Sequence, residues 1–353
     1  MTVSLSSLGW DDRFASAYPL FDRPDHEPGR VVRADRGVCT VLTAGGTVRA
    51  GLGGPAMIAA AADPVALPCA GDWVALRHWP DARTTIESVL PRRSAVVRRT
   101  AGKDSTGQVL AANLDTVAVV ASLDPGPEPA TVERLLALAW ESGAQPVLVL
   151  TKADLVADPA ALADHLAELA PGVPVLPISA EHGYGLAALM PYVAPGRTLG
   201  LLGPSGVGKS TLVNALLGAT VMTTQANRRV DGKGRHTTTY RALMPVPGGG
   251  AVLDTPGIRG VGLLDGEVGL EQTFSDVLAI ITECRFADCG HGEEPGCAVR
   301  EALADGALTG RRWESWCKLQ RELAYESRRR EDRLATAARR RGRQWERPPR
   351  FRL

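Results

Sequence analysis

The feature that most constrains the fold is a glycine-rich loop, Gly203–Ser210, with the sequence GPSGVGKS. It matches GxxxxGK(S/T) in full and lies between a strand-like segment at 198–202 and a helix-like segment at 211–218. Glycines let such a loop form a concave nest of backbone N–H groups that faces a phosphate, and the positive end of the next helix adds to the attraction. The loop therefore predicts an α/β fold, with a parallel sheet flanked by helices.

Four apolar segments are expected to form this sheet. The segments 116–120 and 146–150 are typical of buried parallel strands, and helical spacing at 131–143 between them completes a βαβ unit. A third strand, 198–202, leads into the glycine-rich loop, and a fourth, 251–253, leads into Asp254. Part of the sheet thus precedes the loop in the chain.

The other nucleotide-binding motifs stand in an unusual order around this loop. Thr151-Lys152-Ala153-Asp154 and Ser179-Ala180 precede it, and Asp254-Thr255-Pro256-Gly257 follows it. In an ordinary GTPase the phosphate loop comes first and the base-reading motifs come last. The order therefore favours a circularly permuted GTPase domain, in which the second half of the domain has moved in front of the first.

Each phosphate-site residue has an expected role. Lys209 would bridge the β- and γ-phosphates, and the Ser210 hydroxyl would bind Mg²⁺. Asp254 has the place of the Walker-B acid that holds Mg²⁺, and Gly257 would donate its N–H to the γ-phosphate. The residues expected to line the phosphates are Gly203, Pro204, Ser205, Gly206, Val207, Gly208, Lys209, Ser210 and Thr211.

The base would be read by the motif at 151–154. A carboxylate at Asp154 can accept from guanine N1–H and N2–H₂, a donor pair that adenine does not offer on that edge. The stem of Lys152 can lie over the purine face, and Ser179-Ala180 would supply a backbone N–H to guanine O6. These motifs predict GTP rather than ATP as the nucleotide.

A threonine-rich stretch, GRHTTT at 234–239, lies where a switch threonine is expected. Thr237 and Thr238 are both candidates to close on Mg²⁺ and the γ-phosphate, and the sequence does not choose between them. Ile258 occupies the position where many GTPases have the glutamine that orients water. An apolar side chain cannot orient water, so slow intrinsic turnover that a partner accelerates is expected.

Three cysteines and a histidine crowd into a short segment near the C-terminus. Cys284, Cys289, His291 and Cys297 form the pattern CxxxxCxHxxxxxC. Three thiolates and one imidazole make a closed tetrahedral set, which predicts a structural zinc site rather than a catalytic one. Iron is the alternative metal, and buried cysteines beside an unrelated histidine are the alternative without a metal.

The N-terminal part has a different character from the nucleotide-binding part. Short β-branched alternations broken by glycines, from 29 to about 98, predict a small β-barrel, of which an OB-fold that binds oligonucleotides is one form. A basic connector, 90–107, leads on to the next domain. The expected division is an arm at 1–28, a barrel at 29–98, a GTPase domain at 99–268, a helical zinc-binding domain at 269–327 and an arginine-rich tail at 328–353.

The net charge of +1 conceals an asymmetry. Residues 328–353 contain eleven arginines against three acidic residues, a local charge of +8, so the rest of the chain carries −7. Such a tail commonly contacts nucleic acid, the alternative being a solvated, partly helical tail. The chain has no apolar run of about 18 residues and no signal peptide, and its cysteines suit a reducing compartment, so a cytoplasmic protein without a membrane span is expected.

Taken together, the motifs resemble those of the ribosome small-subunit-dependent GTPase A (RsgA/YjeQ) family. The resemblance rests on the permuted order and on GPSGVGKST at 203–211, GRHTTT at 234–239, DTPGIR at 254–259 and CRFADCGHGEEPGC at 284–297. It implies a factor, here expected to be a monomer, that binds the small (30S) ribosomal subunit late in maturation. It also implies contacts of the OB-fold and zinc domain with 16S rRNA, and hydrolysis of GTP stimulated by the subunit.

Two departures from the family and three alternatives stay open. The arginine-rich tail after Arg328 is longer and more basic than the family leads us to expect, and its role is open. The family's base motif begins with Asn, whereas this chain has Thr151, so guanine affinity is expected to be weaker. A permuted GTPase that acts on the large subunit or another RNA is the first alternative. The others are a non-catalytic RNA-binding module with a structural nucleotide site and an RNA-dependent ATPase.

Overall fold

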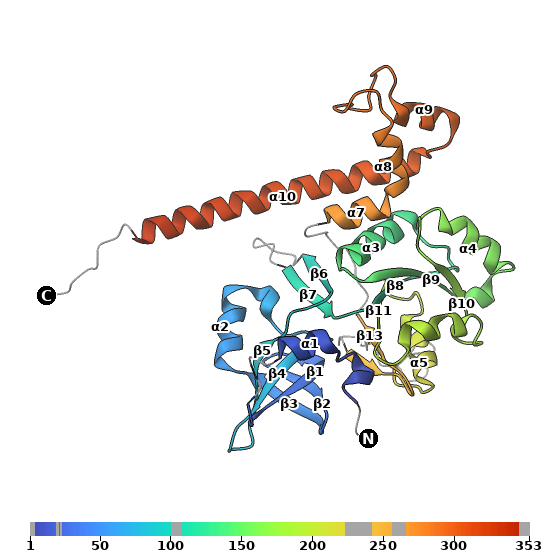
Figure 1. Ribbon diagram of the computed structural model, residues 1–353. Helices are drawn as coiled ribbons and strands as arrows, with labels where there is room; N and C mark the ends of the chain where they lie inside the picture. The colour runs from blue at the N-terminus through green and yellow to red at the C-terminus, as the bar shows by residue number, and fades with distance from the viewer. Residues whose placement is uncertain are drawn as a thin grey trace, which may run out of the picture.

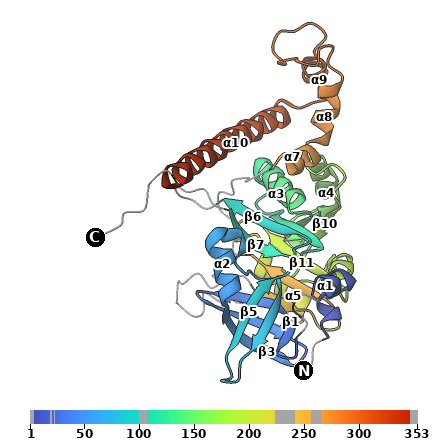
Figure 2. The ribbon, with the colours of Figure 1, turned by 60° about the vertical axis from the view of Figure 1, so that its left-hand side comes forward.

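The computed structural model describes residues 4–18, 21, 23–99, 107–222, 242–255 and 266–345. Three parts follow one another along the chain: a β-barrel, an α/β domain and a set of C-terminal helices (Figure 1). The barrel and the α/β domain lie against each other, whereas the last helix extends away from both (Figures 1 and 2).

The N-terminal part is a closed five-stranded barrel with the strand order β1-β2-β3-β5-β4. Helix α2 and a short 3₁₀ turn, η3, lie between β3 and β4, which is the arrangement of an OB-fold. The predicted barrel is therefore confirmed. Its elements are β1 (His26–Asp35), β2 (Val38–Thr43), β3 (Gly46–Leu52), α2 (Gly54–Ala62), η3 (Pro64–Ala66), β4 (Trp73–His78) and β5 (Thr84–Val89).

Alternation along the strands explains why these segments close into a barrel. Val41, Val74 and Ile86 point into the barrel interior and are fully buried. Trp73, on the opposite face of β4, packs outside the barrel with Phe14 of the N-terminal arm, which consists of η1 (Ser6–Leu8) and α1 (Asp12–Ala17). β4 is buried on both faces because the arm covers the face that the barrel does not.

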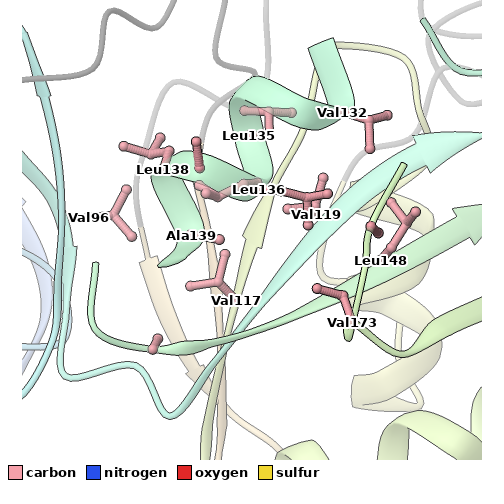
Figure 3. Close-up of a cluster of buried hydrophobic side chains, with 14 of the residues drawn as sticks. Val96, Val117, Val119, Val132, Leu135, Leu136, Leu138, Ala139, Leu148 and Val173 are labelled. Carbon is pink, nitrogen blue, oxygen red and sulfur yellow. The ribbon is translucent and has the colours of Figure 1, made fainter. Parts of the chain in front are cut away.

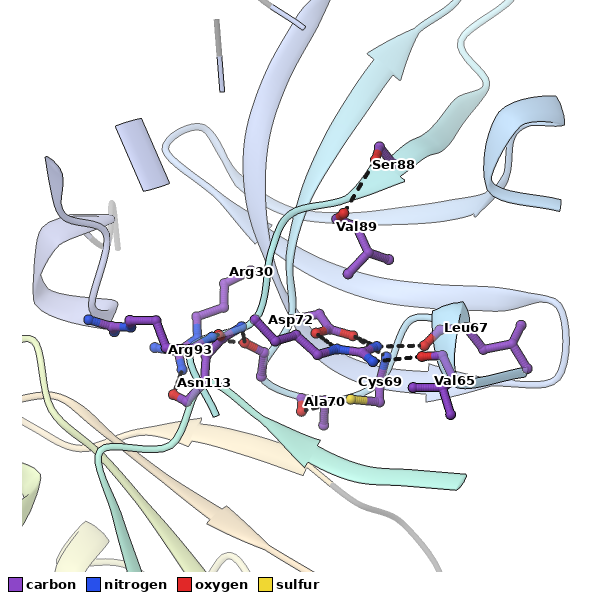
Figure 4. Close-up of polar contacts among 12 residues, drawn as sticks. Arg30, Val65, Leu67, Cys69, Ala70, Asp72, Ser88, Val89, Arg93 and Asn113 are labelled. Carbon is purple, nitrogen blue, oxygen red and sulfur yellow. Dashed lines mark hydrogen bonds and ion pairs between the residues drawn. The ribbon is translucent and has the colours of Figure 1, made fainter. Parts of the chain in front are cut away.

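A buried arginine joins the arm, the barrel and the α/β domain. The Arg30 side chain is 0% exposed, and its guanidinium donates to the carbonyls of Leu8, Gly71 and Asn113. Figure 4 shows Arg30 beside Asn113. Burial lowers the pKa of Arg30 to about 10, so the group stays charged and needs all three acceptors. This junction is therefore held by hydrogen bonds as well as by apolar packing.

The predicted basic connector at 90–107 is corrected by the structure. β6 (Ala95–Arg99) pairs with β7 (Gly107–Ala112) in a separate two-stranded antiparallel sheet. Apolar residues decide this, because Ala95 and Val97 alternate with Val96 and pack against Cys69 and its neighbours. Arg92 makes a bidentate ion pair with buried Asp72 at 2.7 and 2.8 Å, so its charge is used within the fold.

The α/β domain is built on a six-stranded sheet with the order β10-β9-β8-β11-β13-β12. All neighbours are parallel except β12 and β13, so the predicted parallel sheet is confirmed. β11, which leads into the glycine-rich loop, lies between β8 and β13. The strands are β8 (Thr116–Ser122), β9 (Gln145–Thr151), β10 (Val175–Ile178), β11 (Thr198–Leu202), β12 (Ala242–Pro245) and β13 (Ala251–Asp254).

Helices cover both faces of this sheet. On one face Val117 and Val119 of β8 pack under Leu135 and Leu136 of α3 (Pro129–Glu141) (Figure 3). On the other face, the alternate residues of the strands pack against α5 (Lys209–Leu217). The continuous apolar runs of the strands follow from this burial on two sides. The remaining elements are η4 (Ala153–Leu155), α4 (Pro159–Ala167) and η5 (Leu186–Val193).

The C-terminal helices begin against α3. Gly269 of α7 lies so close to α3 that a Cβ there would be 2.1 Å from the Ala137 carbonyl oxygen, and its N–H donates to Glu141 at 2.9 Å. The helices are α7 (Glu267–Thr273), α8 (Ser275–Thr282), α9 (Ala298–Asp305) and α10 (Gly310–Trp345). α10 runs across residue 328, where the arginine-rich composition begins, and extends from the body (Figure 2). Within the described residues, no helix is long and apolar enough to cross a membrane.

Candidate nucleotide site and metal centre

The sheet brings the predicted nucleotide-binding residues of the described segments to one edge. Five parallel strands end there, and the glycine-rich loop follows β11 at that edge. Asp254 ends β13 beside Leu201, and Thr151 ends β9 beside Ser122. Ser179 follows β10 at the same edge. Ligands of open α/β sheets bind at this edge, at the carboxyl ends of the strands.

Backbone geometry explains the glycines of the loop. A Cβ at Gly203 would lie 2.4 Å from the carbonyl oxygen of Val120, so the loop could not approach β8 with any other residue there. Gly206 and Gly208 have φ values of 89° and 92°, a conformation that favours glycine. Gly208 also precedes the first turn of α5. The loop and the helix end therefore have the form of a phosphate site.

Lys209 is folded back onto this loop. Its ammonium donates to the carbonyl oxygens of Gly203 and Pro204 at 2.8 and 2.7 Å, and the residue is only 7% exposed. Burial lowers the pKa of Lys209, and the nearby Asp254 carboxylate opposes that change. The ammonium is thus desolvated beside the phosphate nest, where an anion would gain most from it.

Asp254 is a buried carboxylate without a hydrogen-bond donor. It is 1% exposed, and neither of its oxygens has a partner among the described residues. Burial raises its pKa to about 6, although Lys209 acts in the opposite direction. The next residue, Thr255, fixes the strand end by donating its hydroxyl to the Leu201 carbonyl at 2.6 Å. A buried acid that lacks a partner is costly, and carboxylate oxygens are the kind of ligand that a divalent cation takes.

At the other end of the site, the side chain of Thr151 contacts the backbone of two other segments. Its side chain is buried, and its hydroxyl lies 3.1 Å from the carbonyl oxygen of Ala121 and close to that of Val207 in the glycine-rich loop. The hydroxyl has one proton, so it donates to one carbonyl at a time. Thr151 therefore ties the base motif to the phosphate loop.

Neighbouring groups hold Asp154 and Lys152 at the base end of the site. Asp154 accepts a hydrogen bond from Ser179, which is the largest cause of its lowered pKa. Lys152 has a left-handed backbone with φ of 59°, and its ammonium donates to the Asp124 carbonyl oxygen at 2.7 Å. The Ser179 N–H is already used by the Tyr184 carbonyl at 3.0 Å, which leaves the N–H of Ala180 as the candidate donor to a base.

The four predicted metal ligands come together. The ligand atoms of Cys284, Cys289, His291 and Cys297 all lie within 4.8 Å of one another. His291 Nδ1 lies 3.6 Å from the Cys284 sulfur and 3.7 Å from the Cys297 sulfur. A tetrahedral ion with metal–sulfur bonds of about 2.3 Å and a metal–nitrogen bond of about 2.1 Å needs separations of about 3.6 Å. The cluster therefore fits a tetrahedral metal ion.

Neighbouring groups hold this cluster in place. The Glu294 carboxylate accepts from the N–H groups of Gly290 and Gly292 at 3.0 and 2.7 Å, which closes the loop around His291. Trp313 of α10 packs edge-on against the His291 ring, with centroids 5.4 Å apart. The metal cluster is thus fastened to the base of α10. The other cysteines, Cys39, Cys69 and Cys317, lie in apolar packing.

Comparisons with known proteins agree with this geometry. Residues 89–264 match the RsgA GTPase family model. The chain is 53% identical over 322 residues to the small ribosomal subunit biogenesis GTPase RsgA of Streptomyces coelicolor, covering 90% of this chain and 86% of that protein. It is 45% identical to the protein of the same name from Opitutus terrae, covering 96% and 94%.

The chain belongs to the RsgA GTPase family. Its activity is therefore GTP hydrolysis. The crystal structure of YjeQ from Thermotoga maritima is 27% identical, with a TM-score of 0.61 over 85% of this chain and 99% of that one. YloQ, a circularly permuted GTPase, is 23% identical, with a TM-score of 0.58 over 86% and 96%. The predicted circular permutation is confirmed.

Within this RsgA-family fold, α3 links the nucleotide site to the C-terminal helices. Its first turns and the glycine-rich loop line one cavity of about 240 Å³. Further along α3, the fully buried Glu133 accepts from Arg312 at 2.7 Å and from Ser315. Arg312 also donates to Asp276 of α8 and to the Thr273 carbonyl of α7. One ion-pair network therefore fastens three C-terminal helices to α3.

Some predicted site residues lie where the structure is not described, and two residues near the site were not predicted. Thr237, Thr238, Gly257 and Ile258 lie outside the described residues. Neither Glu133 nor His182, which contacts Ser179, belongs to a motif visible in the sequence. His182 follows the Ser-Ala motif by only two residues, and that short spacing is the signal that could have found it.

Proposed function

We propose that this protein is a GTPase that binds the small ribosomal subunit and assists its late maturation. The observation that carries the proposal is the unpartnered Asp254 beside Lys209 at the end of β13, in a permuted GTPase fold flanked by an OB-like barrel and a Cys₃His cluster. The names of the relatives, small ribosomal subunit biogenesis GTPases, supply the biological context.

At the phosphate end, Lys209 would release its two loop carbonyls and bind the β- and γ-phosphates. Ser210 and Asp254 would hold Mg²⁺, which supplies charge neutralisation during phosphoryl transfer. Gly257 and one of Thr237 and Thr238 would sense the γ-phosphate, as the family motifs imply. Binding would replace the desolvated, unsatisfied groups of this end by charge-assisted contacts.

At the base end, Asp154 would accept from guanine N1–H and N2–H₂ while Ser179 holds its carboxylate. The stem of Lys152 would cover one purine face, and the N–H of Ala180 would donate to O6. Thr151 and Ala153 would position this motif against the phosphate loop. GTP, rather than ATP, is the substrate that this donor and acceptor pattern suits.

The flanking parts would bind the subunit through 16S rRNA. The barrel would present its strands to RNA, as OB-folds do, and the basic helix α10 would neutralise phosphates. Cys284, Cys289, His291 and Cys297 would hold a structural zinc ion, so chelation should unfold the segment 284–297 and weaken subunit binding while leaving GDP binding intact. The protein would act as a monomer in the cytoplasm, where subunits mature.

GTP hydrolysis should be measured for the purified protein alone and with separated small or large ribosomal subunits, with ATP as the control. Strong stimulation by the small subunit alone, selective for GTP, is expected. Stimulation by the large subunit only would favour the alternative of a large-subunit factor. No hydrolysis under any condition would favour a non-catalytic RNA-binding module, and equal use of ATP would favour an ATPase.

A further inference from the structure

Glu133 of α3 is a fully buried acid whose partners lie on another helix. Among the described residues, its carboxylate accepts from Arg311 at 2.9 Å, from Arg312 at 2.7 Å and from Ser315. These donors come from the first two turns of α10. A buried carboxylate is stable only when such donors compensate for the water that it has lost. The network therefore fixes the positions of α3 and α10 relative to each other.

The first turn of α10 also holds the other C-terminal helices and adjoins the metal centre. Arg312 is 3% exposed, and it donates to Asp276 of α8 at 2.8 Å and to the Thr273 carbonyl of α7 at 2.7 Å. The next residue, Trp313, packs against His291 of the Cys₃His cluster. A continuous series of contacts therefore leads from the metal centre to α3.

The same part of α3 lines the cavity beside the phosphate loop. Residues 204–207 of the glycine-rich loop form one wall of this cavity of about 240 Å³. The α3 wall includes Thr131, Val132 and Leu135. Glu133 directly follows Val132, so successive residues of one helical turn contact the cavity and α10. A displacement of α3 would therefore change the surroundings of the loop.

We propose that Glu133 is a positioning residue that couples the C-terminal helices to the phosphate loop, so that small-subunit binding by these helices accelerates GTP hydrolysis through α3. The backbones of α3 and α7 are in direct contact, because a Cβ at Gly269 would lie 2.1 Å from the Ala137 carbonyl oxygen. A shift of the C-terminal helices therefore moves α3 with them. This inference rests on the proposed function and goes beyond it, because it assigns the route of stimulation to one buried network.

Two matched substitutions separate coupling from simple attachment of the helices. Glu133→Gln keeps an oxygen toward the arginines and places an amide toward the Ser315 hydroxyl, but it removes the charge that pairs with Arg312. Glu322→Gln makes the same change in a partly exposed pair, in which Glu322 of α10 accepts from Arg134 of α3 at 2.6 and 2.7 Å. Both pairs join α3 to α10, but only Glu133 belongs to the buried network.

Hydrolysis of GTP by the full-length protein, alone and with the small ribosomal subunit, gives the first readout. Glu133→Gln should lower the stimulated rate about three- to thirtyfold and leave the rate without subunit within about twofold of the wild type. Glu322→Gln should keep full stimulation. Ser315→Ala removes one neutral donor and leaves the ion pair, so it should lower the stimulated rate only about twofold.

The affinity for the subunit gives a second readout, because coupling between two binding sites is reciprocal. The wild type should bind the small subunit with different affinities when it holds GDP and when it holds a non-hydrolysable GTP analogue. The ratio of the two affinities should approach one in Glu133→Gln and keep its wild-type value in Glu322→Gln. A purely structural role of Glu133 would weaken both affinities alike and leave the ratio unchanged.

The outcomes separate this inference from the proposed function. A wild type that the small subunit does not stimulate would overturn both. A stimulated wild type would overturn the coupling alone if Glu133→Gln were stimulated equally, if Glu322→Gln lost as much, or if the affinity ratio of Glu133→Gln were unchanged. Thermal unfolding and GDP binding show whether Glu133→Gln is folded. If it is not, Ser315→Ala decides, and full stimulation of that variant would overturn the coupling.

Discussion

The two ends of the nucleotide site contain carboxylates with opposite electrostatic environments. Asp154, at the base end, has its pKa lowered mainly by a hydrogen bond from Ser179. Asp254, at the phosphate end, has its pKa raised to about 6 by burial, and no donor among the described residues reaches it. The base end is thus organised by the chain itself, whereas the phosphate end is left for a ligand to complete.

The two ends therefore have different tasks: the base end selects the nucleotide, and the phosphate end takes part in hydrolysis. A carboxylate that is already held by Ser179 can select a base with little rearrangement. A buried ammonium and a buried carboxylate, Lys209 and Asp254, cost stability until an ion and a phosphate arrive, and that cost makes the phosphate end responsive to what is bound. Substitutions at the two ends should therefore have different signatures.

The largest effect is expected at Lys209. Lys209→Ala removes the cation that would stabilise the charge on the phosphates in the transition state. Subunit-stimulated GTP hydrolysis should therefore fall on the order of 10²- to 10³-fold. Single-turnover hydrolysis measures this. The preference for GDP over ADP should survive, because the base end is untouched. Arg13→Ala, at an exposed arginine of the N-terminal arm, is the control, and equal hydrolysis by both variants would contradict the assignment.

At the base end, Asp154→Asn should mainly change selectivity. The amide offers one acceptor where the carboxylate offers two, so GDP affinity should fall about 10- to 100-fold and approach that of ADP. Equilibrium binding of both nucleotides measures the change. Asp164→Asn, at an exposed acid of α4, should bind as the wild type does. An unchanged preference for GDP would refute the base assignment.

Much of this site could be predicted from sequence because its motifs are local. The glycines of the loop, Asp254 and the Cys₃His spacing each reflect a short-range geometric requirement, and the periodicity of the strands gave the sheet. Contacts between distant segments could not be predicted this way. Glu133 and Arg312 are 179 positions apart, and only the packing of α10 against α3 brings them together.

The predicted basic connector at 90–107 shows a second reason why sequence patterns do not give the whole structure. The segment 90–107 is rich in basic residues, although buried Val96 and partly buried Ala95 and Val97 decide its structure. Three of its arginines have partners within the chain, because Arg92 pairs with Asp72, Arg93 with Asp11 and Arg98 with Gln108. A run of basic residues indicates that acidic groups will lie nearby. It does not show whether those groups belong to another molecule or to the same chain.

The next effect concerns stability and has an unusual sign. The folded pKa of Asp254, about 6, lies above the ordinary value of 3.8, so the folded protein holds a proton between these pH values that the unfolded chain releases. The stabilising contribution is therefore complete below about pH 4 and is lost as the pH rises through about 6.

Asp254→Asn should thus stabilise the nucleotide-free protein at pH 7.5, by roughly 1–3 kcal/mol, while it abolishes Mg²⁺-dependent hydrolysis. At pH 5 the stabilisation should be smaller. Thermal unfolding at both pH values, without nucleotide, checks this, with Asp164→Asn as the control. A lower melting temperature for Asp254→Asn at pH 7.5 would mean that the carboxylate is satisfied in the folded state, and the contrast between the two ends would disappear.

The smallest effect is expected at Thr151, which connects the two ends. Thr151→Val keeps the shape but removes the hydroxyl that reaches the Val207 and Ala121 carbonyls, so it should lower stability and GDP binding by about 1 kcal/mol each. Thr151→Ser should restore both, and Thr220→Val, at an exposed threonine, should change neither. If Thr151→Val weakened GDP binding without lowering stability, the hydroxyl would act on the nucleotide directly. Equal losses in GDP and ADP binding would instead place its action on the phosphate loop, because both nucleotides share that loop and only one of them suits the base end.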